Sequence, residues 1–149
     1  MKMLNTKTVE NFDLKRYLGT WHQIATIPSW FQLNLTNVKA EYSTRKDGLI
    51  NVKNSGIGKL SGFKSSLKGT ARVVNPEIPA TLKVKFFLNE GDYFVLELDE
   101  DYQWAMVGGS DKDSLWILSR NRNLSDEIYQ MLYQKAKQRG YEVSKLVKT

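Results

Sequence analysis

The sequence predicts an all-β fold, an eight-stranded up-and-down antiparallel β-barrel with one C-terminal α-helix packed on its wall. Three observations lead to this prediction. Segments typical of strands recur at short spacing between residues 20 and 120, the dipeptide Asp47-Gly48 is a hairpin signal between two of them, and one amphipathic helical pattern follows. Connections this short exclude parallel crossovers, so neighbouring strands are expected to be antiparallel. Eight such strands avoid exposed edges by closing into a barrel, which has room for one small ligand.

The strands are expected at residues 20–27, 37–45, 49–56, 65–75, 80–87, 93–98, 103–109 and 114–120. The first of them begins after Gly19. In the segment 80–87, Leu82, Val84 and Phe86 alternate with polar residues, which predicts that one face points inward. The turn-forming residues Asn89–Asp92 are expected to separate this strand from the next one.

A helix is expected at about residues 126–139. Ser125 is a suitable N-cap, acidic residues follow it, basic residues occupy the last turn, and Gly140 can end the helix. Residues 141–147 are typical of a short closing strand. A chain of 149 residues with 41% hydrophobic content suits a single domain over residues 1–149, with the barrel at about 18–120.

Alternation decides which side chains of the first strand face the interior. The expected inward residues are Trp21, Gln23, Ala25 and Ile27, and the expected outward residues are His22, Ile24 and Thr26. Trp21 would then plug one end of the barrel, where an indole buries a large apolar area and donates its N–H. Arg120, at the end of the last barrel strand, is expected to stack on this indole by cation–π attraction.

The opposite end of the barrel is expected to be open. The loop after the first strand holds Trp30, Phe31, Leu33 and Leu35. A soluble protein has little reason to gather so many apolar side chains in a loop unless they line an opening. We therefore expect this loop to form the portal to the interior.

Basic residues are concentrated in the first half of the chain. Residues 1–75 hold 12 Lys and Arg against 4 Asp and Glu, and the segment Lys53–Arg72 contains no carboxylate. Within it, Lys59 and Lys64 are the expected basic residues of the portal, where they would attract a phosphate or carboxylate head. The alternative is a solvated sheet edge kept soluble by its lysines.

The chain has no cysteine and a single histidine, His22. These counts exclude disulfides and cysteine nucleophiles and leave few ligands for zinc or iron, so we expect no metal and no cofactor. The sequence shows neither the apolar run of a signal peptide nor the ~18 apolar residues of a membrane span. As written, the protein is expected to be cytoplasmic; removal of a lipoprotein signal before residue 1 would place it in the periplasm or at the outer membrane.

Three segments resemble, in order, the conserved blocks of the lipocalin family. They are N-F-D-L-K-R-Y-L-G-T-W at residues 11–21, D-E-D-Y-Q-W-A at 99–105 and L-W-I-L-S-R-N at 115–121. A lone G-x-W would be a weak signal, but three blocks at matching spacing are specific. The resemblance extends from about Val9 to Thr149. Within the family, the sequence most resembles the bacterial outer-membrane lipocalins, the plant temperature-induced lipocalins and apolipoprotein D.

The resemblance implies a barrel closed at one end and a cup that holds a fatty acid or lysophospholipid without catalysis. The matching signature residues are Gly19, Trp21, Tyr102 and Arg120. By resemblance, the cup positions are Tyr42, Asn54, Phe94 and Trp116, and alternation adds Leu82, Val84, Phe86, Leu96 and Leu98. Gln23 stands where related sequences carry an inward carboxylate. We expect a monomer or weak dimer that contacts a membrane surface peripherally and binds no nucleic acid.

Other interpretations compete with this one. The inward aromatic residues would also suit a dry core. A lipid isomerase on the same fold needs a cysteine in the cup, which the chain lacks, and Tyr42 with Gln23 is a poor acid–base pair. A haem or pigment carrier would need a ligand such as His22, which is expected to point outward. A nucleic-acid-binding barrel would place its aromatic residues on an exposed face rather than inward.

Overall fold

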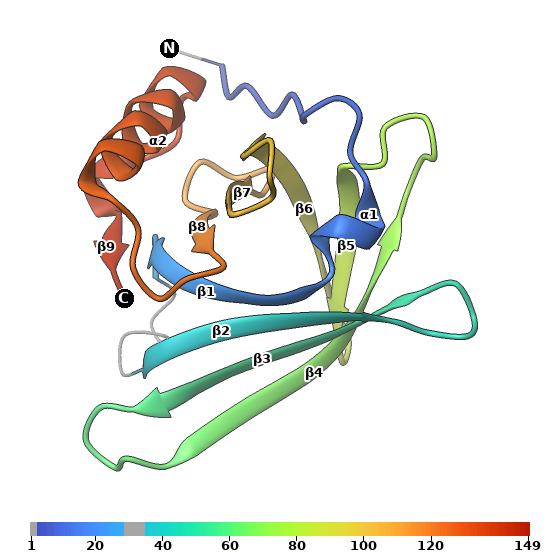
Figure 1. The fold of residues 1–149 in the computed structure, drawn as a ribbon, viewed down its shortest axis with the longest axis horizontal. Helices are drawn as coiled ribbons and strands as arrows, with labels where there is room; N and C mark the ends of the chain where they lie inside the picture. Colours follow the sequence, from blue (N-terminus) through green and yellow to red (C-terminus); the bar gives the residue numbers. More distant parts are fainter. Residues whose placement is uncertain (1–2, 29–34) are drawn as a thin grey trace.

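The structure, a computed structural model, describes residues 3–28 and 35–149 and is an eight-stranded antiparallel barrel (Figure 1). The barrel strands are β1 (Gly19–Thr26), β2 (Leu35–Thr44), β3 (Ile50–Gly58), β4 (Lys64–Val73), β5 (Thr81–Phe86), β6 (Asn89–Leu98), β7 (Trp104–Gly108) and β8 (Leu115–Ser119). Each strand pairs with the next along the chain, and β1 pairs with both β8 and β2, which closes the barrel. The predicted fold class is therefore confirmed.

The turn between β5 and β6 differs from the prediction. Phe86 pairs with Asn89, so the turn consists of Phe87 and Leu88 alone, and residues 89–92 belong to β6. The ladder to β5 outweighs the turn preference of this Asn-Glu-Gly-Asp segment. Pairing of the two strands also places Asp92 directly opposite Lys83, and these side chains form a salt bridge of 3.0 Å.

The C-terminal helix α2 (Asp126–Arg139) has the predicted bounds and caps. The hydroxyl of Ser125 accepts a hydrogen bond from the Ile128 amide, and Gly140 ends the helix in the left-handed conformation with φ of 101°. Arg139 ties this end to the barrel because its guanidinium donates to Glu97 of β6 at 2.8 Å. No helix in residues 3–28 and 35–149 combines the length and the apolarity needed to cross a bilayer.

Two short helices were not predicted. Helix α1 (Leu14–Tyr17) precedes β1 and begins after Asp13, whose side chain accepts a hydrogen bond from the Lys15 amide. One turn is too short to leave a helical period in the sequence. The predicted strand at 141–147 is largely wrong, because η2 (Val143–Lys145) is a 3₁₀ turn and only β9 (Val147–Lys148) pairs with β1.

Apolar residues form two clusters, one inside the barrel and one between its wall and α2 (Figure 1). Trp21 lies in the inner cluster, whereas Ala25 and Ile27 of the same stretch lie in the outer one. The prediction that Ala25 and Ile27 face inward is wrong. A register shift between Gln23 and Ala25 reverses the alternation of β1 at this point.

Candidate functional site

One end of the barrel is closed by a stack of Trp21 and Arg120. The indole is fully buried, and its N–H donates to the carbonyl of Tyr17 at 2.8 Å. The guanidinium carbon of Arg120 lies 3.8 Å from the centre of the ring, within range of cation–π attraction. The remaining guanidinium N–H groups donate to the main-chain carbonyls of three segments: Arg16, Thr20 and Tyr102, at 2.8 to 3.1 Å. One side chain therefore links α1, β1 and the loop before β7.

Gly19 and Tyr102 complete this closed end. Gly19 has φ of 103°, and a Cβ at this position would lie 3.3 Å from Nη1 of Arg120, so both the conformation and the space favour glycine. The hydroxyl of Tyr102 accepts a hydrogen bond from the Asp13 amide at 2.9 Å, and Arg16 lies 4.2 Å over its ring. The four signature residues taken from the sequence thus meet in one place.

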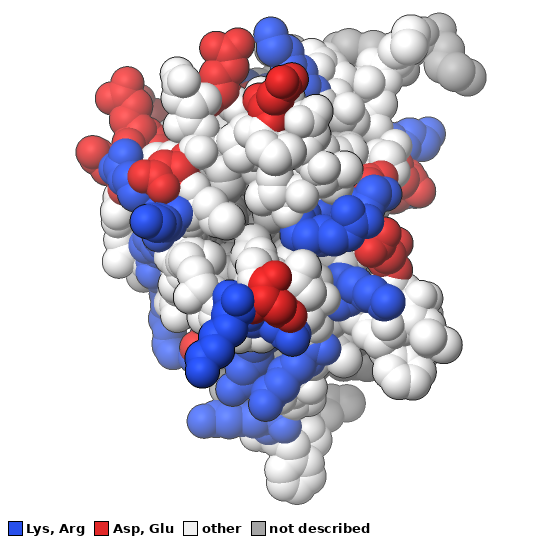
Figure 2. Space-filling model, turned by 90° about the vertical axis from the view of Figure 1, so that its right-hand side faces the viewer, with Lys and Arg blue, Asp and Glu red and all other residues white. Residues whose placement is uncertain are grey.

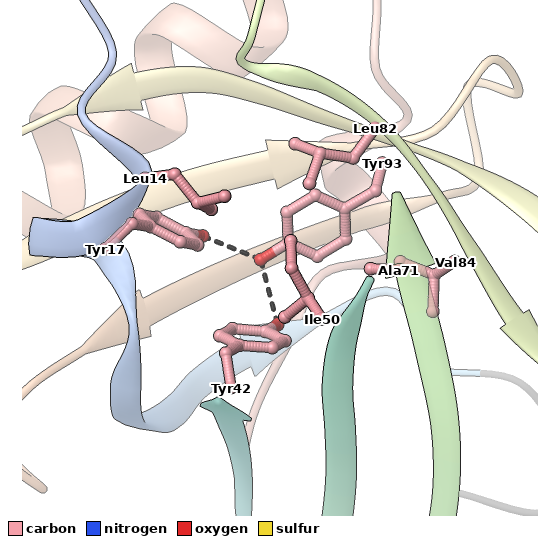
Figure 3. Close-up of a pocket in the computed structure, with 8 residues that line it drawn as sticks. All are labelled: Leu14, Tyr17, Tyr42, Ile50, Ala71, Leu82, Val84 and Tyr93. Atoms are coloured by element: carbon pink, nitrogen blue, oxygen red, sulfur yellow. Dashed lines mark hydrogen bonds between the residues drawn. The ribbon is translucent and has the colours of Figure 1, made fainter. Parts of the chain in front are cut away.

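Above this plug, three tyrosines form the floor of the interior (Figure 3). The hydroxyl of Tyr93 lies 2.6 Å from that of Tyr17 and 2.9 Å from that of Tyr42. Five apolar residues surround them: Leu14, Ile50, Ala71, Leu82 and Val84. The space that these eight residues enclose is about 10 Å³, enough for roughly one water molecule.

Burial keeps these hydroxyls neutral. It raises the pKa of Tyr42 to about 12 and the pKa values of Tyr17 and Tyr93 well above the usual value of 10.0. The floor is therefore a neutral hydrogen-bonded cluster that offers no general base at ordinary pH. Sequence reasoning missed Tyr17 and Tyr93. Tyr93 lies on the same face of β6 as Val95, and the sequence does not distinguish this face from the one with Phe94 and Leu96, because both are apolar.

Toward the rim, inward side chains become accessible to water. Leu82, near the floor, is 4% exposed. Leu67 pairs with Asn54 of β3, which in turn pairs with the inward Ala40, so all three share the inner face, yet Leu67 is 51% exposed. Phe86 and Trp116 also pack against the inner cluster and are only partly buried. Exposure of inward side chains therefore increases from the floor toward the rim, where β4 extends past its last pair with β5, Thr70 with Lys85.

Seven of the nine predicted cup residues therefore lie on the inner face: Tyr42, Asn54, Leu82, Val84, Phe86, Leu98 and Trp116. Phe94 and Leu96 do not, because both pack in the outer cluster against α2. The inward residues of β6 are Tyr93 and Val95, and a register shift between Val95 and Glu97 brings the predicted Leu98 inward as well. The sequence could not separate the two faces of β6, since both carry apolar residues.

Gln23 also differs from the prediction. Its amide nitrogen donates to the hydroxyl of Thr149 at 2.8 Å, and its side chain lines an outer depression with Arg122 and Lys148. Gln23 therefore contacts the C-terminus rather than the interior. The depression lies outside the barrel wall and has no part in the cup.

The predicted portal is described only in part. Trp30, Phe31 and Leu33 lie outside the described residues, whereas Leu35, expected in the same loop, is the first residue of β2. Lys59 and Lys64 are exposed and flank the turn between β3 and β4. In an up-and-down barrel this turn lies at the end opposite the Trp21 plug, which places both lysines at the rim.

A metal site finds no support in the described part of the chain, which contains no group of three or more His, Cys, Asp or Glu suited to hold an ion. His22 lies on β1 between Lys39 of β2 and Ser119 of β8. Burial, followed by the nearby charges of Arg122 and Lys39, lowers its pKa from the usual 6.5. This histidine is therefore mostly neutral near pH 7.

Comparison with known proteins places the chain in a family. Residues 12–149 match the model of the lipocalin-like domain. The chain is 44% identical over 140 residues to the outer membrane lipoprotein Blc of Escherichia coli, covering 93% of this chain and 79% of that protein. It is 38% identical over 153 residues to temperature-induced lipocalin-1 of Arabidopsis thaliana, covering 96% and 81%. Apolipoprotein D of Macaca fascicularis is 33% identical over 148 residues, covering 94% and 77%.

Solved structures support the fold. Apocrustacyanin C2 aligns with a TM-score of 0.79 at 22% identity, covering 99% of this chain and 87% of that one. Insecticyanin from the tobacco hornworm Manduca sexta aligns with a TM-score of 0.74 at 22% identity, covering 99% and 85%. Together with the family model and the closed, cup-shaped barrel, these comparisons show that the chain belongs to the lipocalin family, whose members bind small hydrophobic ligands.

Proposed function

We propose that the protein binds one fatty acid or lysophospholipid, with the acyl tail in the cup and the polar head at the rim. The observation that carries this proposal is the gradient of exposure along the inner face. Apolar residues are sealed at the floor and open to water toward the rim. The floor itself is too tightly packed for a tail, so the tail would lie above the tyrosines, beside Asn54, Phe86 and Trp116.

Burial of methylene groups supplies the affinity. Each buried methylene contributes ~0.8 kcal/mol, so about ten of them would contribute roughly 8 kcal/mol before the cost of ordering the ligand. A micromolar dissociation constant is therefore reachable from the tail alone. Lys59 and Lys64, exposed at the rim, would attract the carboxylate or phosphate of the head. The name of the bacterial relative, an outer membrane lipoprotein, agrees with a lipocalin that works near membranes.

Chain length provides the test. Hexadecanoate has six more methylenes than decanoate, so it should bind at least roughly 100-fold more tightly. Affinity is measured by displacement of a fluorescent fatty acid, and quenching of Trp116, identified with the Trp116→Phe variant, reports where the tail lies. Equal affinity for the two acids would contradict the proposal, because a tail in the cup must contribute in proportion to its buried length.

The described residues give no support for a catalytic function. The tyrosines of the floor stay protonated at ordinary pH, and Gln23, considered from the sequence as a partner of Tyr42, contacts Thr149 instead. The apocrustacyanins and insecticyanin share only the fold with this chain at 22% to 23% identity, so they give no reason to prefer a particular ligand.

A further inference from the structure

Two turns at the open end present large apolar side chains to solvent. The turn between β3 and β4 carries Leu60 and Phe63, which are 98% and 77% exposed. The turn between β5 and β6 carries Phe87 and Leu88, which are 87% and 82% exposed. Alternate turns of an up-and-down barrel lie at the same end, so both apolar tips stand at the mouth of the cup. Single exposed hydrophobic residues are ordinary, but two tips that each carry a neighbouring pair indicate a contact surface.

The backbone at Phe87 strengthens this conclusion. A two-residue hairpin turn favours Asn, Asp or Gly because it needs positive φ, and Phe87 adopts φ of 55°. A bulky residue in this conformation costs stability. Its ring is exposed, so packing within the chain does not offset that cost. Strained residues of this kind concentrate at functional sites, and here the ring itself is the feature held out to solvent.

Basic side chains lie at the turn between β3 and β4 and farther along the outer wall of these two strands. Lys53 of β3 lies directly opposite Lys68 of β4 on one side and Glu41 of β2 on the other. In the described part of the chain, no carboxylate lies within salt-bridge distance of either lysine, nor of Lys59 or Lys64. Figure 2, which faces the side of the molecule with the turn between β2 and β3, shows Lys and Arg side chains gathered over its lower part around an acidic group.

We propose that the open end docks on an anionic lipid bilayer. The two apolar tips, Leu60 with Phe63 and Phe87 with Leu88, would enter the headgroup region, and Lys59 and Lys64 at the turn would face the lipid phosphates. The tips are convex and stand on separate turns, so a protein partner would need two matching pockets. A bilayer adapts to both. Docking would bring the mouth of the cup to the lipids. This role of docking rests on the proposed function, but the docking surface itself is inferred independently of it.

Vesicle flotation tests the proposal. The full chain should float with vesicles of phosphatidylcholine containing phosphatidylglycerol, and binding should weaken in pure phosphatidylcholine or at high salt. In the double variant Phe87→Gly/Leu88→Ser, the partition coefficient onto vesicles should fall by roughly tenfold or more, because two apolar side chains no longer enter the lipid. Glycine adopts positive φ without strain, so the change at residue 87 should not lower the melting temperature. A loss of binding in a fully stable variant cannot come from misfolding.

Matched controls come from the closed end. Ile78 is exposed on the turn between β4 and β5, and Lys46 is exposed on the turn between β2 and β3. Ile78→Ser should leave flotation unchanged, and Lys46→Glu should weaken it less than Lys64→Glu. The proposal is overturned if the double variant floats like the parent, or if pure phosphatidylcholine captures the protein equally well at every salt concentration. It is also overturned if sedimentation shows that these tips hold a dimer together instead. Solution binding of hexadecanoate, measured separately, shows whether the cup works when docking fails.

Discussion

Replacing Arg120 should unfold the closed end of the barrel, because this guanidinium joins three segments. In Arg120→Met, the protein loses three hydrogen bonds to main-chain carbonyls and the stack on Trp21. At about 1 kcal/mol for each bond of this partly exposed group, and about 1 kcal/mol for the cation–π contact, the free energy of unfolding should fall by about 4 kcal/mol. For a chain of this size, the melting temperature should fall by roughly 8 to 16 °C.

Urea unfolding followed by far-ultraviolet circular dichroism measures this loss without relying on tryptophan emission. Arg122→Met is the matched control, because Arg122 is exposed two residues later. Its effect should stay within about 0.5 kcal/mol. A loss below about 1 kcal/mol in Arg120→Met would refute the reasoning, since the barrel would then be closed by packing alone.

Two further predictions concern the same end of the barrel. Gly19→Ala should lower the free energy of unfolding by about 1 to 2 kcal/mol in urea, because alanine is strained at φ of 103° and its Cβ crowds Arg120; an unchanged midpoint would contradict this. Stability should also fall as the pH rises from 10 toward 12, because Tyr42 ionises near 10 when unfolded and only at about 12 when folded, so the unfolded state loses its proton first. The slope should be about 1.4 kcal/mol per pH unit shallower in Tyr42→Phe, and equal slopes in pH-dependent unfolding would argue against a buried hydroxyl.

The sequence predicts most of the barrel because its strands obey local rules. Alternation places Leu82 and Val84 correctly, since β5 has polar residues on its outer face. The caps Ser125 and Gly140 define the helix for the same reason, because each acts within its own turn: Ser125 through its hydroxyl and Gly140 through its left-handed backbone.

The errors occur where a longer-range contact decides. The faces of β6 cannot be told apart by hydrophobicity, because α2 covers the outer one and both are apolar; Phe94 and Leu96 were assigned to the wrong side. The bulge in β1 that turns Ala25 outward leaves no mark in composition. Phe87 and Leu88 are residues that turns disfavour, so local preferences predicted the turn at residues 89–92 instead. In the structure these residues belong to β6.

The central claim is that an acyl chain occupies the upper part of the cup, and native mass spectrometry with hexadecanoate tests it directly. The unsubstituted protein should carry one fatty acid per chain. Asn54→Trp would fill the cup from the inner face of β3 and should abolish the adduct, whereas Asn51→Trp, exposed on the outer face of the same strand, should retain it. An adduct that survives in folded Asn54→Trp, or one that is absent from the unsubstituted protein, would contradict the account.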